Sequence, residues 1–425
     1  MSTLKVNKIR DTSGSADAIT LDPSGGAVLA GVTTISTASI TTAKVGAAVT
    51  ISESGIEASG IGITCASIND GQVGGRRNMI INGAMQIAQR GTTFNSIATA
   101  QVAIDRFRWE QGGTGAVSAW NVTQKSDAAR EIGFENSLKV EVATVDSSLA
   151  SNHYSQFKYQ IETNDIIKQS SYGLSTAKKM TLSFYVKSSV TGTFPLAFNN
   201  GNGSRSNPHV YTINSANTWE RKVITFVGDT GGTWQTQGGS SAGFGIRWGL
   251  AVGSGYFGTA DGAWAADSSY ANLYASYSNA LVTTSGATWE LTGVQLEIGE
   301  EATSFEHRSV GEELQLCSRY FQQFEGGSNN FFASGFTAGN DFYGGGTLPM
   351  GKMRAAPTIA VDGTLSHLNY THVAVSANAS SITNQGGGNA SFVLRLQSTT
   401  NTTSNAGAYA RLVNSNTNLT FDAEI

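Results

Sequence analysis

Cysteine, charge and proline are scarce in this chain of 425 residues, and each scarcity excludes a class of protein. The two cysteines, Cys65 and Cys317, permit at most one disulfide bond, which excludes a disulfide framework and a thiolate metal site. The net charge is −4 and no Lys/Arg block is longer than a pair such as Arg76–Arg77. Binding to nucleic acid or to an anionic membrane by charge is therefore not expected. Five prolines without a G-X-Y period exclude collagen.

Long apolar runs are also missing. The opening MSTLKVNKIRDTSG alternates apolar and basic residues, and no stretch of about 18 apolar residues follows anywhere. The sequence therefore predicts neither a signal peptide nor membrane insertion.

Aromatic residues are absent from the first 93 positions, although the chain holds 19 Phe, 13 Tyr and 7 Trp. This segment instead carries Val and Ile at short intervals among Gly, Ser, Thr and Ala, a pattern that indicates short strands and turns. Such strands bury little apolar surface and need identical neighbours to cover them. Residues 1–77 are therefore predicted to form an extended β shaft in which several chains intertwine, with an anchor at the start. A flexible linker is the alternative.

Residues 78–308 change to strands of ordinary globular type, and they predict a jelly-roll sandwich. Turn residues separate the strands, and no helical pattern lies between them, so antiparallel pairing is expected. Apolar and polar residues mostly alternate in eight stretches: 103–110, 116–124, 137–144, 154–161, 179–188, 218–228, 243–253 and 287–299.

A short helix is predicted at 309–325. Ser309 and Glu312 form a capping box, and Glu312 and Glu313 lie where the helix dipole favours negative charge. The apolar steps of 4, 3, 4 and 3 predict either a seam on a trimer axis or a connector packed on the sandwich. The seam residues are Val310, Leu314, Cys317, Phe321 and Phe324.

Residues 326–425 alternate again with period two and predict a second, smaller β domain at the tip. The fold class is thus all-β: shaft, sandwich, one short helix and a C-terminal β domain. The stretch 326–346 is rich in Gly and Asn and carries several aromatic residues, among them Phe336 and Tyr343. These are either an exposed binding loop or strand residues that fill a trimer core.

Two sequence patterns look catalytic, and both are interpreted as chance matches in a glycine-rich chain. Residues 239–243 fit G-x-S-x-G and residues 253–258 fit G-x-G-x-x-G, but neither is followed by a helical pattern. The five His show no metal-ligand spacing, and acidic residues such as Asp261 and Asp267 fit turns better than a glycosidase pair or a Ca2+ site. We therefore expect no enzyme activity, no cofactor and no metal.

The segment 253–280 gathers Tyr256, Phe257 and Trp264 with further tyrosines in a Gly/Ala/Ser-rich region. Flat rings beside Asn and Asp suit sugar recognition, because pyranose C–H faces stack on rings while side chains bind the hydroxyls. Packing into a neighbouring subunit is the alternative. Together with Phe336 and Tyr343, these three residues are the candidate ligand contacts, and the low charge favours a neutral glycan.

Four passages resemble bacteriophage tail fibre or receptor-binding proteins, especially those of marine phages. They are residues 1–26, 74–94 (GGRRNMIINGAMQIAQRGTTF), 291–322 and 353–363 (MRAAPTIAVDG). The passage NMIINGAMQI is also similar to the opening strand of jelly-roll carbohydrate-binding modules, and residues 288–297 to their closing strand.

The resemblance implies a homotrimer in the virion tail, made in the host cytoplasm. Its N-terminus would bind other tail proteins, and its C-terminal end would face the host. The predicted function is attachment to a host-surface glycan or outer-membrane receptor. The alternatives are a structural tail or baseplate fibre without receptor binding, and a glycan depolymerase.

Overall fold

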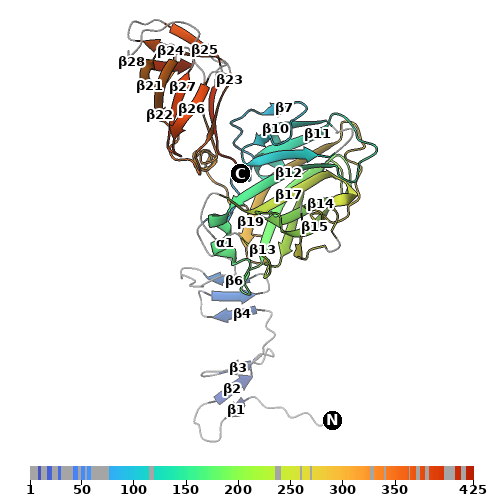
Figure 1. Ribbon diagram of the computed structural model, residues 1–425. Coiled ribbons are helices and arrows are strands. Elements are labelled where there is room, and N and C mark those ends of the chain that lie inside the picture. The colour runs from blue at the N-terminus through green and yellow to red at the C-terminus, as the bar shows by residue number, and fades with distance from the viewer. Residues whose placement is uncertain are drawn as a thin grey trace. The chain divides into compact units, whose positions relative to one another are not determined.

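The computed structural model divides into two units, Met1–Cys65 and Ala66–Ile425 (Figure 1). In the first unit it describes six strands. Between residues 76 and 425 it describes 76–113, 119–234, 241–258, 261–268, 270–325, 330–338, 341–362, 364–369, 374–378, 382–396, 407–412 and 418–425.

The six strands of the first unit form two antiparallel sheets of three strands each. The strands are three to five residues long, which confirms the prediction of short strands. Apart from residues 76 and 77, the rest of the predicted shaft, and Cys65 with it, lies outside the described residues. The strands are β1 Lys8–Arg10, β2 Asp17–Leu21, β3 Ala27–Leu29, β4 Thr42–Val45, β5 Val49–Ser52 and β6 Gly55–Ala58.

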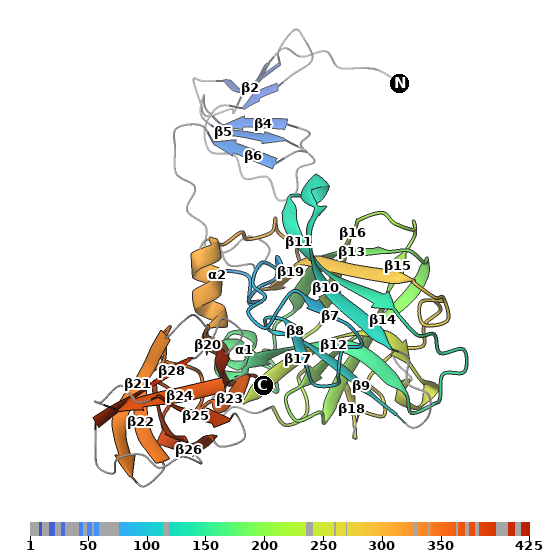
Figure 2. The same cartoon turned by 90° about the horizontal axis from the view of Figure 1, so that it is seen from above.

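Two antiparallel sheets of six and seven strands form the predicted sandwich (Figures 1 and 2). Their orders are β16-β13-β19-β11-β10-β7 and β18-β15-β14-β17-β12-β9-β8. The chain passes repeatedly from one sheet to the other, as in jelly rolls. The strands are β7 Thr93–Phe94, β8 Val102–Ile104, β9 Phe107–Gly112, β10 Trp120–Ala129, β11 Phe134–Val142, β12 Tyr154–Glu162, β13 Met180–Ser188, β14 Gly192–Asn200, β15 Arg205–Ile213, β16 Glu220–Phe226, β17 Ala242–Val252, β18 Ala265–Ala266 and β19 Thr288–Ile298.

The period-two alternation of the strands builds the core between the sheets. Phe157 of β12 packs against Trp109 of β9, with ring centroids 5.1 Å apart, and against Trp289 of the opposite sheet at 6.4 Å. All three rings are fully buried. Because neighbouring residues on a strand face opposite ways, Gln156 and Lys158 must lie on the outer face of the seven-stranded sheet.

A helix and a turn passage of the sandwich differ from the prediction, and strands β14 and β15 were not predicted. A helix, α1 Thr163–Ser170, follows β12 directly, where no helix was expected. The passage 78–87, expected as an opening strand, forms turns instead. Asn82 and Met85 both have positive φ, and the Asn82 side chain donates to the carbonyls of Ile87 and Asp105. These side-chain hydrogen bonds hold the turns, and only isolated backbone bonds, from Met79 to Leu296 and from Val294 to Gly83, link the passage to β19.

The predicted connecting helix is real but shorter than expected. Helix α2 spans Val310–Cys317, and the Ser309 hydroxyl accepts a hydrogen bond from the Glu312 amide at 3.3 Å, which confirms the N-cap. The prediction of a helix through Phe324 is wrong: Phe321–Phe324 is strand β20, which pairs with β29.

The five seam residues therefore do not share one helix face. Val310 is 59% exposed, whereas Cys317 is fully buried within its own chain. Phe321 packs under the Arg90 guanidinium at 3.8 Å, and Phe324 packs on Phe421 at 5.9 Å. The regular apolar spacing therefore does not mark one buried face: the buried residues of the helix are Glu313 and Cys317, and the last two apolar positions belong to a strand.

The C-terminal segment forms the predicted second β domain, with a three-stranded sheet β20-β29-β23 and a seven-stranded sheet β25-β24-β28-β21-β22-β27-β26. Its core includes Phe342, Phe392 and Phe421, all essentially inaccessible to solvent. The strands after β20 are β21 Asn330–Ala338, β22 Asp341–Thr347, β23 Thr358–Asp362, β24 Thr364–Asn369, β25 Ala374–Asn378, β26 Ile382–Gly387, β27 Ser391–Leu396, β28 Gly407–Leu412 and β29 Asn418–Asp422.

A buried ionic cluster joins the sandwich to the segment that leads into this domain. The Glu162 carboxylate at the end of β12 accepts hydrogen bonds from Tyr320 at 2.7 Å and Arg319 at 2.8 Å. Its side chain is 4% exposed. Burial raises the pKa of Glu162, but Tyr320 and Arg319 lower it by more, so the pKa lies below its usual value.

Replacing this carboxylate is expected to cost stability. Glu162→Gln should lower the free energy of unfolding by about 1–3 kcal/mol, because it leaves the buried Tyr320 hydroxyl and the half-exposed Arg319 without their charged acceptor. Since the folded-state pKa is lowered, Glu162 contributes its stability above the pKa of the unfolded chain. That contribution is lost as the pH falls through the folded-state pKa. Urea unfolding of both proteins between pH 7 and pH 3 measures the difference, which should shrink at low pH.

The matched control is Glu300→Gln, because Glu300 forms an exposed pair with Lys179 at 2.8 Å. Its loss should change the unfolding free energy by less than about 0.5 kcal/mol. Equal effects of the two substitutions would contradict the assignment of Glu162 as a buried anchor.

Candidate functional site

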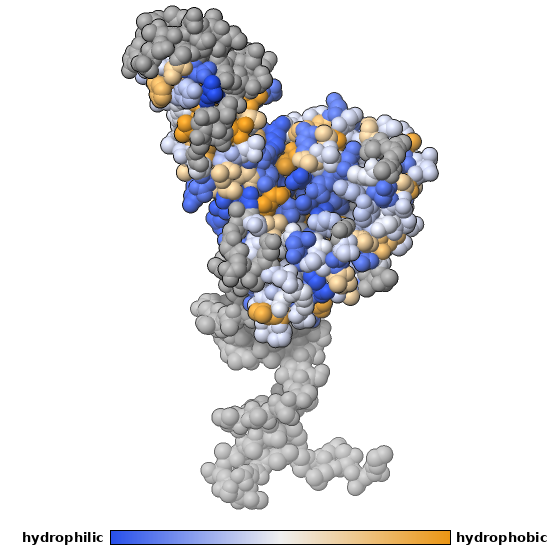
Figure 3. Space-filling model, viewed as in Figure 1, coloured by the Kyte–Doolittle hydropathy of each residue, from blue (hydrophilic) through white to orange (hydrophobic). Residues whose placement is uncertain are grey.

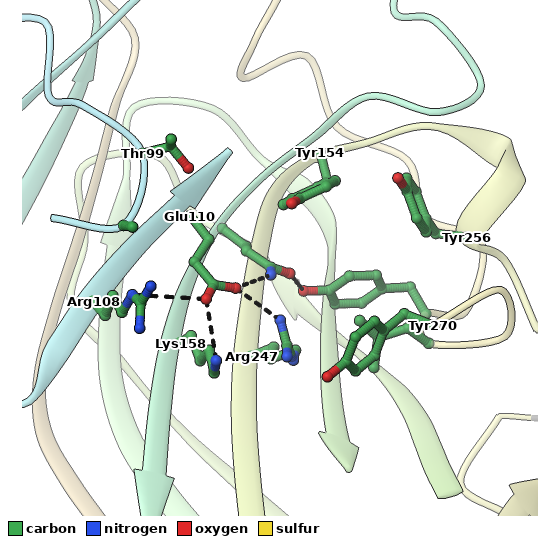
Figure 4. Close-up of a pocket in the computed structure, with 12 residues that line it drawn as sticks. Thr99, Arg108, Glu110, Tyr154, Lys158, Arg247, Tyr256 and Tyr270 are labelled. Atoms are coloured by element: carbon green, nitrogen blue, oxygen red, sulfur yellow. Dashed lines mark hydrogen bonds and ion pairs between the residues drawn. The ribbon is translucent and has the colours of Figure 1, made fainter. Parts of the chain in front are cut away.

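A pocket of about 480 Å3 lies on the outer face of the seven-stranded sheet of the sandwich (Figure 4). Its floor comes from β9, β12 and β17, and its wall from the segment that follows β17. The lining residues are Thr99, Ala100, Arg108, Glu110, Tyr154, Gln156, Lys158, Arg247, Tyr256, Tyr270, Leu273 and Tyr274.

Strand register brings three cations into one row across the floor. Lys158 of β12 lies opposite Arg108 of β9 on one side and opposite Arg247 of β17 on the other. Glu110 lies on the same face as Arg108, two residues along β9, and opposite Gln156. The sheet thus places five polar side chains from three strands within reach of one another.

Glu110 lies at the centre of this cluster, as Figure 4 shows. Its carboxylate contacts Arg247 at 3.0 Å, Lys158 at 3.1 Å and Arg108 at 3.8 Å. The Gln156 amide also donates to it, at 3.0 Å. The side chains become less exposed with depth, from 31% for Arg108 and 17% for Glu110 to 4% for Arg247.

The charges around Glu110 determine its protonation. Burial raises the pKa of the Glu110 carboxyl, but Arg247, Lys158 and Arg108 together lower it by more, so the pKa lies below its usual value. Glu110 is therefore a carboxylate at neutral pH and can only accept hydrogen bonds.

Tyrosines from the segment 253–280 form the wall of the pocket. The hydroxyl of the buried Tyr274 donates to Gln156 Oε1. A Cβ on Gly249 would lie 2.8 Å from Pro195 and 3.3 Å from Tyr274, so a glycine there lets the segment approach the sheet. Within one chain, the segment 253–280 therefore packs on the outer face of the seven-stranded sheet.

Three further tyrosine rings remain partly exposed at the pocket. Tyr154 and Tyr256 meet edge to face with centroids 5.5 Å apart, and the Arg247 guanidinium lies 4.6 Å from the centre of the Tyr270 ring. The pocket therefore combines aromatic faces with a floor of charged hydrogen-bonding groups.

The candidate residues of the sandwich divide between the pocket and the packing around it. Tyr256 lines the pocket. Phe257 packs edge to face on Tyr277, and Trp264 lies in an aromatic cluster with Tyr172 and Trp234 while its indole donates to the Val227 carbonyl at 2.8 Å. Neither Phe257 nor Trp264 lines the pocket.

The other two candidates, Phe336 and Tyr343, form a separate surface on the C-terminal domain. They are cross-strand neighbours of β21 and β22 and stack with centroids 5.7 Å apart, and Phe336 is 52% exposed. Arg395 contacts Tyr343 and pairs with Asp341 at 2.6 Å. This aromatic pair offers a partly exposed, stacked aromatic surface.

Among the described residues, the two catalytic-looking sequence patterns, at 239–243 and 253–258, do not lie in the structural context that their chemistry requires. Residues 253–258 contain a single 3-10 turn, Ser254–Tyr256, and no α-helix begins within them; part of 239–243 and the two residues after 258 lie outside the described residues. Within the described part of the chain, no three His, Cys, Asp or Glu side chains gather as a metal site would require, and neither helix is long and apolar enough to cross a membrane.

The face of the sandwich seen in Figure 3 is mostly hydrophilic, with small separate hydrophobic areas. A broad apolar docking surface is therefore not visible on that face of the sandwich.

Comparisons with known proteins give distant likenesses. No family model matches the chain, and no curated protein matches it. Among solved structures, the enzymatically active domain of bacteriophage CBA120 tailspike protein 4 matches with a TM-score of 0.27 and 16% identity, over 48% of this chain and 21% of that one.

Two carbohydrate-binding modules are similarly distant. The family 11 module of Clostridium thermocellum Lic26A-Cel5E has a TM-score of 0.24 and 13% identity, over 51% of this chain and 98% of the module. The CBM22-1 xylan-binding domain of Paenibacillus barcinonensis Xyn10C has a TM-score of 0.24 and 10% identity, over 56% of this chain and 100% of that domain. These values are too low to assign a function.

Proposed function

We propose that this protein is a homotrimeric phage tail fibre that attaches to its host by binding a surface glycan in the pocket of its sandwich. The observation that carries the binding is the pocket itself: partly exposed tyrosine rings beside a buried network of hydrogen-bonding side chains. A sugar requires both, because its C–H faces are apolar and its hydroxyls are polar.

Each part of the pocket has a role in this binding. Tyr154, Tyr256 and Tyr270 offer ring faces or edges to a pyranose, and Glu110 and Gln156 offer acceptors for its hydroxyls. A pocket of about 480 Å3 lies within the range of small-molecule sites. Individual sites of this kind bind weakly, and three per fibre would raise the avidity by about 100- to 10,000-fold where geometry permits.

The tail-fibre part of the proposal rests on the sequence resemblance of residues 1–26, 74–94, 291–322 and 353–363. In this proposal the N-terminal segment binds other tail proteins, and three chains supply the neighbours that the short strands of the first unit require.

We propose binding without cleavage. Glycosidases of the common kinds use two carboxyl groups, one of them protonated. Among the residues that line the pocket, Glu110 alone carries a carboxyl group, and its lowered pKa makes it a poor proton donor. A reducing-end assay on host polysaccharide should therefore show no release of sugar.

Competition for attachment tests the proposal. Host cells are incubated with the purified full-length protein, and phage particles that still attach are then counted. A receptor-binding fibre should reduce attachment in a dose-dependent way. If the folded protein leaves attachment unchanged and does not bind the cells, the proposal is wrong and a structural role within the virion replaces it.

A further inference from the structure

We infer that the pocket takes an anionic saccharide, one that carries a carboxylate or a sulfate ester; this inference rests on the proposed function. Three cations, Arg108, Lys158 and Arg247, line the pocket against a single carboxylate, Glu110. The pocket thus carries an excess of two positive charges in a chain whose net charge is −4.

The arrangement of the cations is unfavourable without a further anion. Arg108, Lys158 and Arg247 lie directly opposite one another on three adjacent strands, and like charges in such positions repel. Lys158 is 12% exposed and Arg247 4%, so water screens this repulsion poorly. Burial and the nearby Arg247 and Arg108 both lower the pKa of Lys158, and Glu110 offsets them in part.

Arg108 is the cation best placed to meet a ligand. Its side chain is the most exposed of the three, at 31%, and its distance to Glu110, 3.8 Å, is longer than a hydrogen bond. Its Nε, the atom that faces Glu110, is buried without a hydrogen-bond partner among the described residues, so the exposed part of the side chain belongs to the rest of the guanidinium and its stem. A partly exposed guanidinium matches the paired oxygens of a carboxylate or sulfate.

The tyrosine rings of the pocket favour a saccharide over a small free anion, because a free anion has no apolar face to pack against them. In Figure 4, Arg108 lies on one side of Glu110 and Tyr154, Tyr256 and Tyr270 lie on the other. A sugar ring against the tyrosines could therefore direct an acidic substituent toward Arg108 and Lys158. This differs from the neutral glycan that the low charge of the whole chain suggested.

The test uses the surface polysaccharide purified from the host cells to which the protein attaches. Three forms are compared by isothermal titration with the full-length protein: intact, carboxyl-reduced and desulfated. Removing the acidic group that the pocket binds should weaken affinity about ten- to one hundredfold, and the reduced and desulfated forms distinguish the two sources of charge. Affinity for the intact form should also fall as ionic strength rises.

Two variants locate the effect in the pocket. Arg108→Gln should weaken binding of the intact polysaccharide about tenfold or more and affect the neutralised form much less. Arg221→Gln removes an exposed arginine from β16 of the opposite sheet and should bind like the wild type.

The outcomes separate the two proposals. If the protein binds the intact, reduced and desulfated forms with equal affinity, or if Arg108→Gln weakens all of them alike, the inference of an anionic ligand is wrong while glycan binding stands. If a folded protein binds none of the three forms, the proposed function fails.

Discussion

Replacing Tyr154 and Tyr270 together by alanine is expected to lower the affinity for the host polysaccharide about a hundredfold. Each ring supplies an apolar face in the pocket, and the loss of one such face corresponds to about a tenfold change. Both rings are partly exposed, so the fold should survive their removal. Isothermal titration gives the affinity, and circular dichroism of the same samples checks the fold.

The control is a double alanine variant that removes two aromatic rings from a different domain. Phe336 and Tyr343 also form an exposed aromatic pair, on the C-terminal domain. Their double alanine variant should keep its affinity for the polysaccharide if the sandwich pocket is the binding site. If this variant loses binding and the pocket variant keeps it, the site has been assigned to the wrong domain.

Phe157→Ala is expected to lower the free energy of unfolding of the sandwich by about 3–5 kcal/mol. Phe157 is fully buried, and its ring packs against Trp109 within its sheet and Trp289 across the core. Truncation leaves a cavity where the two sheets meet. Urea unfolding followed by tryptophan fluorescence measures the loss as a lower midpoint.

The same substitution should also weaken glycan binding, because Gln156 and Lys158 flank Phe157 on β12 and face the pocket. Leu174→Ala is the control, since Leu174 is 60% exposed and its truncation should change stability by less than about 0.5 kcal/mol. A loss below about 1 kcal/mol for Phe157→Ala would mean that this ring does not join the two sheets.

The alternation of apolar and polar residues predicted the strands of the sandwich well where one face of a strand is buried and the other is open to solvent. It failed for β14, whose residues from Phe194 to Asn200 are all buried. The outer face of the sheet there is covered: Pro195 and Tyr274 both lie close to Gly249. Pro195 and Pro208 further weakened the strand signal of β14 and β15. The burial of both faces of these strands depends on a segment that is distant in the sequence, and a local residue pattern does not show such packing.

The pocket of the sandwich was predicted only in part. The cluster of aromatic residues in 253–280 pointed to Tyr256, but Arg108, Glu110, Lys158 and Arg247 gave no signal of their own. Each is one of many polar residues that face outward from a strand. Their proximity depends on β9, β12 and β17 being neighbours in a particular register, which follows from the topology of the whole sheet.

A crystal structure of the protein with an oligosaccharide prepared from the host polysaccharide tests glycan binding in the sandwich pocket directly. We expect a sugar ring against Tyr154 or Tyr270, with its polar groups on Glu110 and its acidic substituent beside Arg108. A sugar bound at Phe336 and Tyr343, with the sandwich pocket empty, would contradict binding in the pocket.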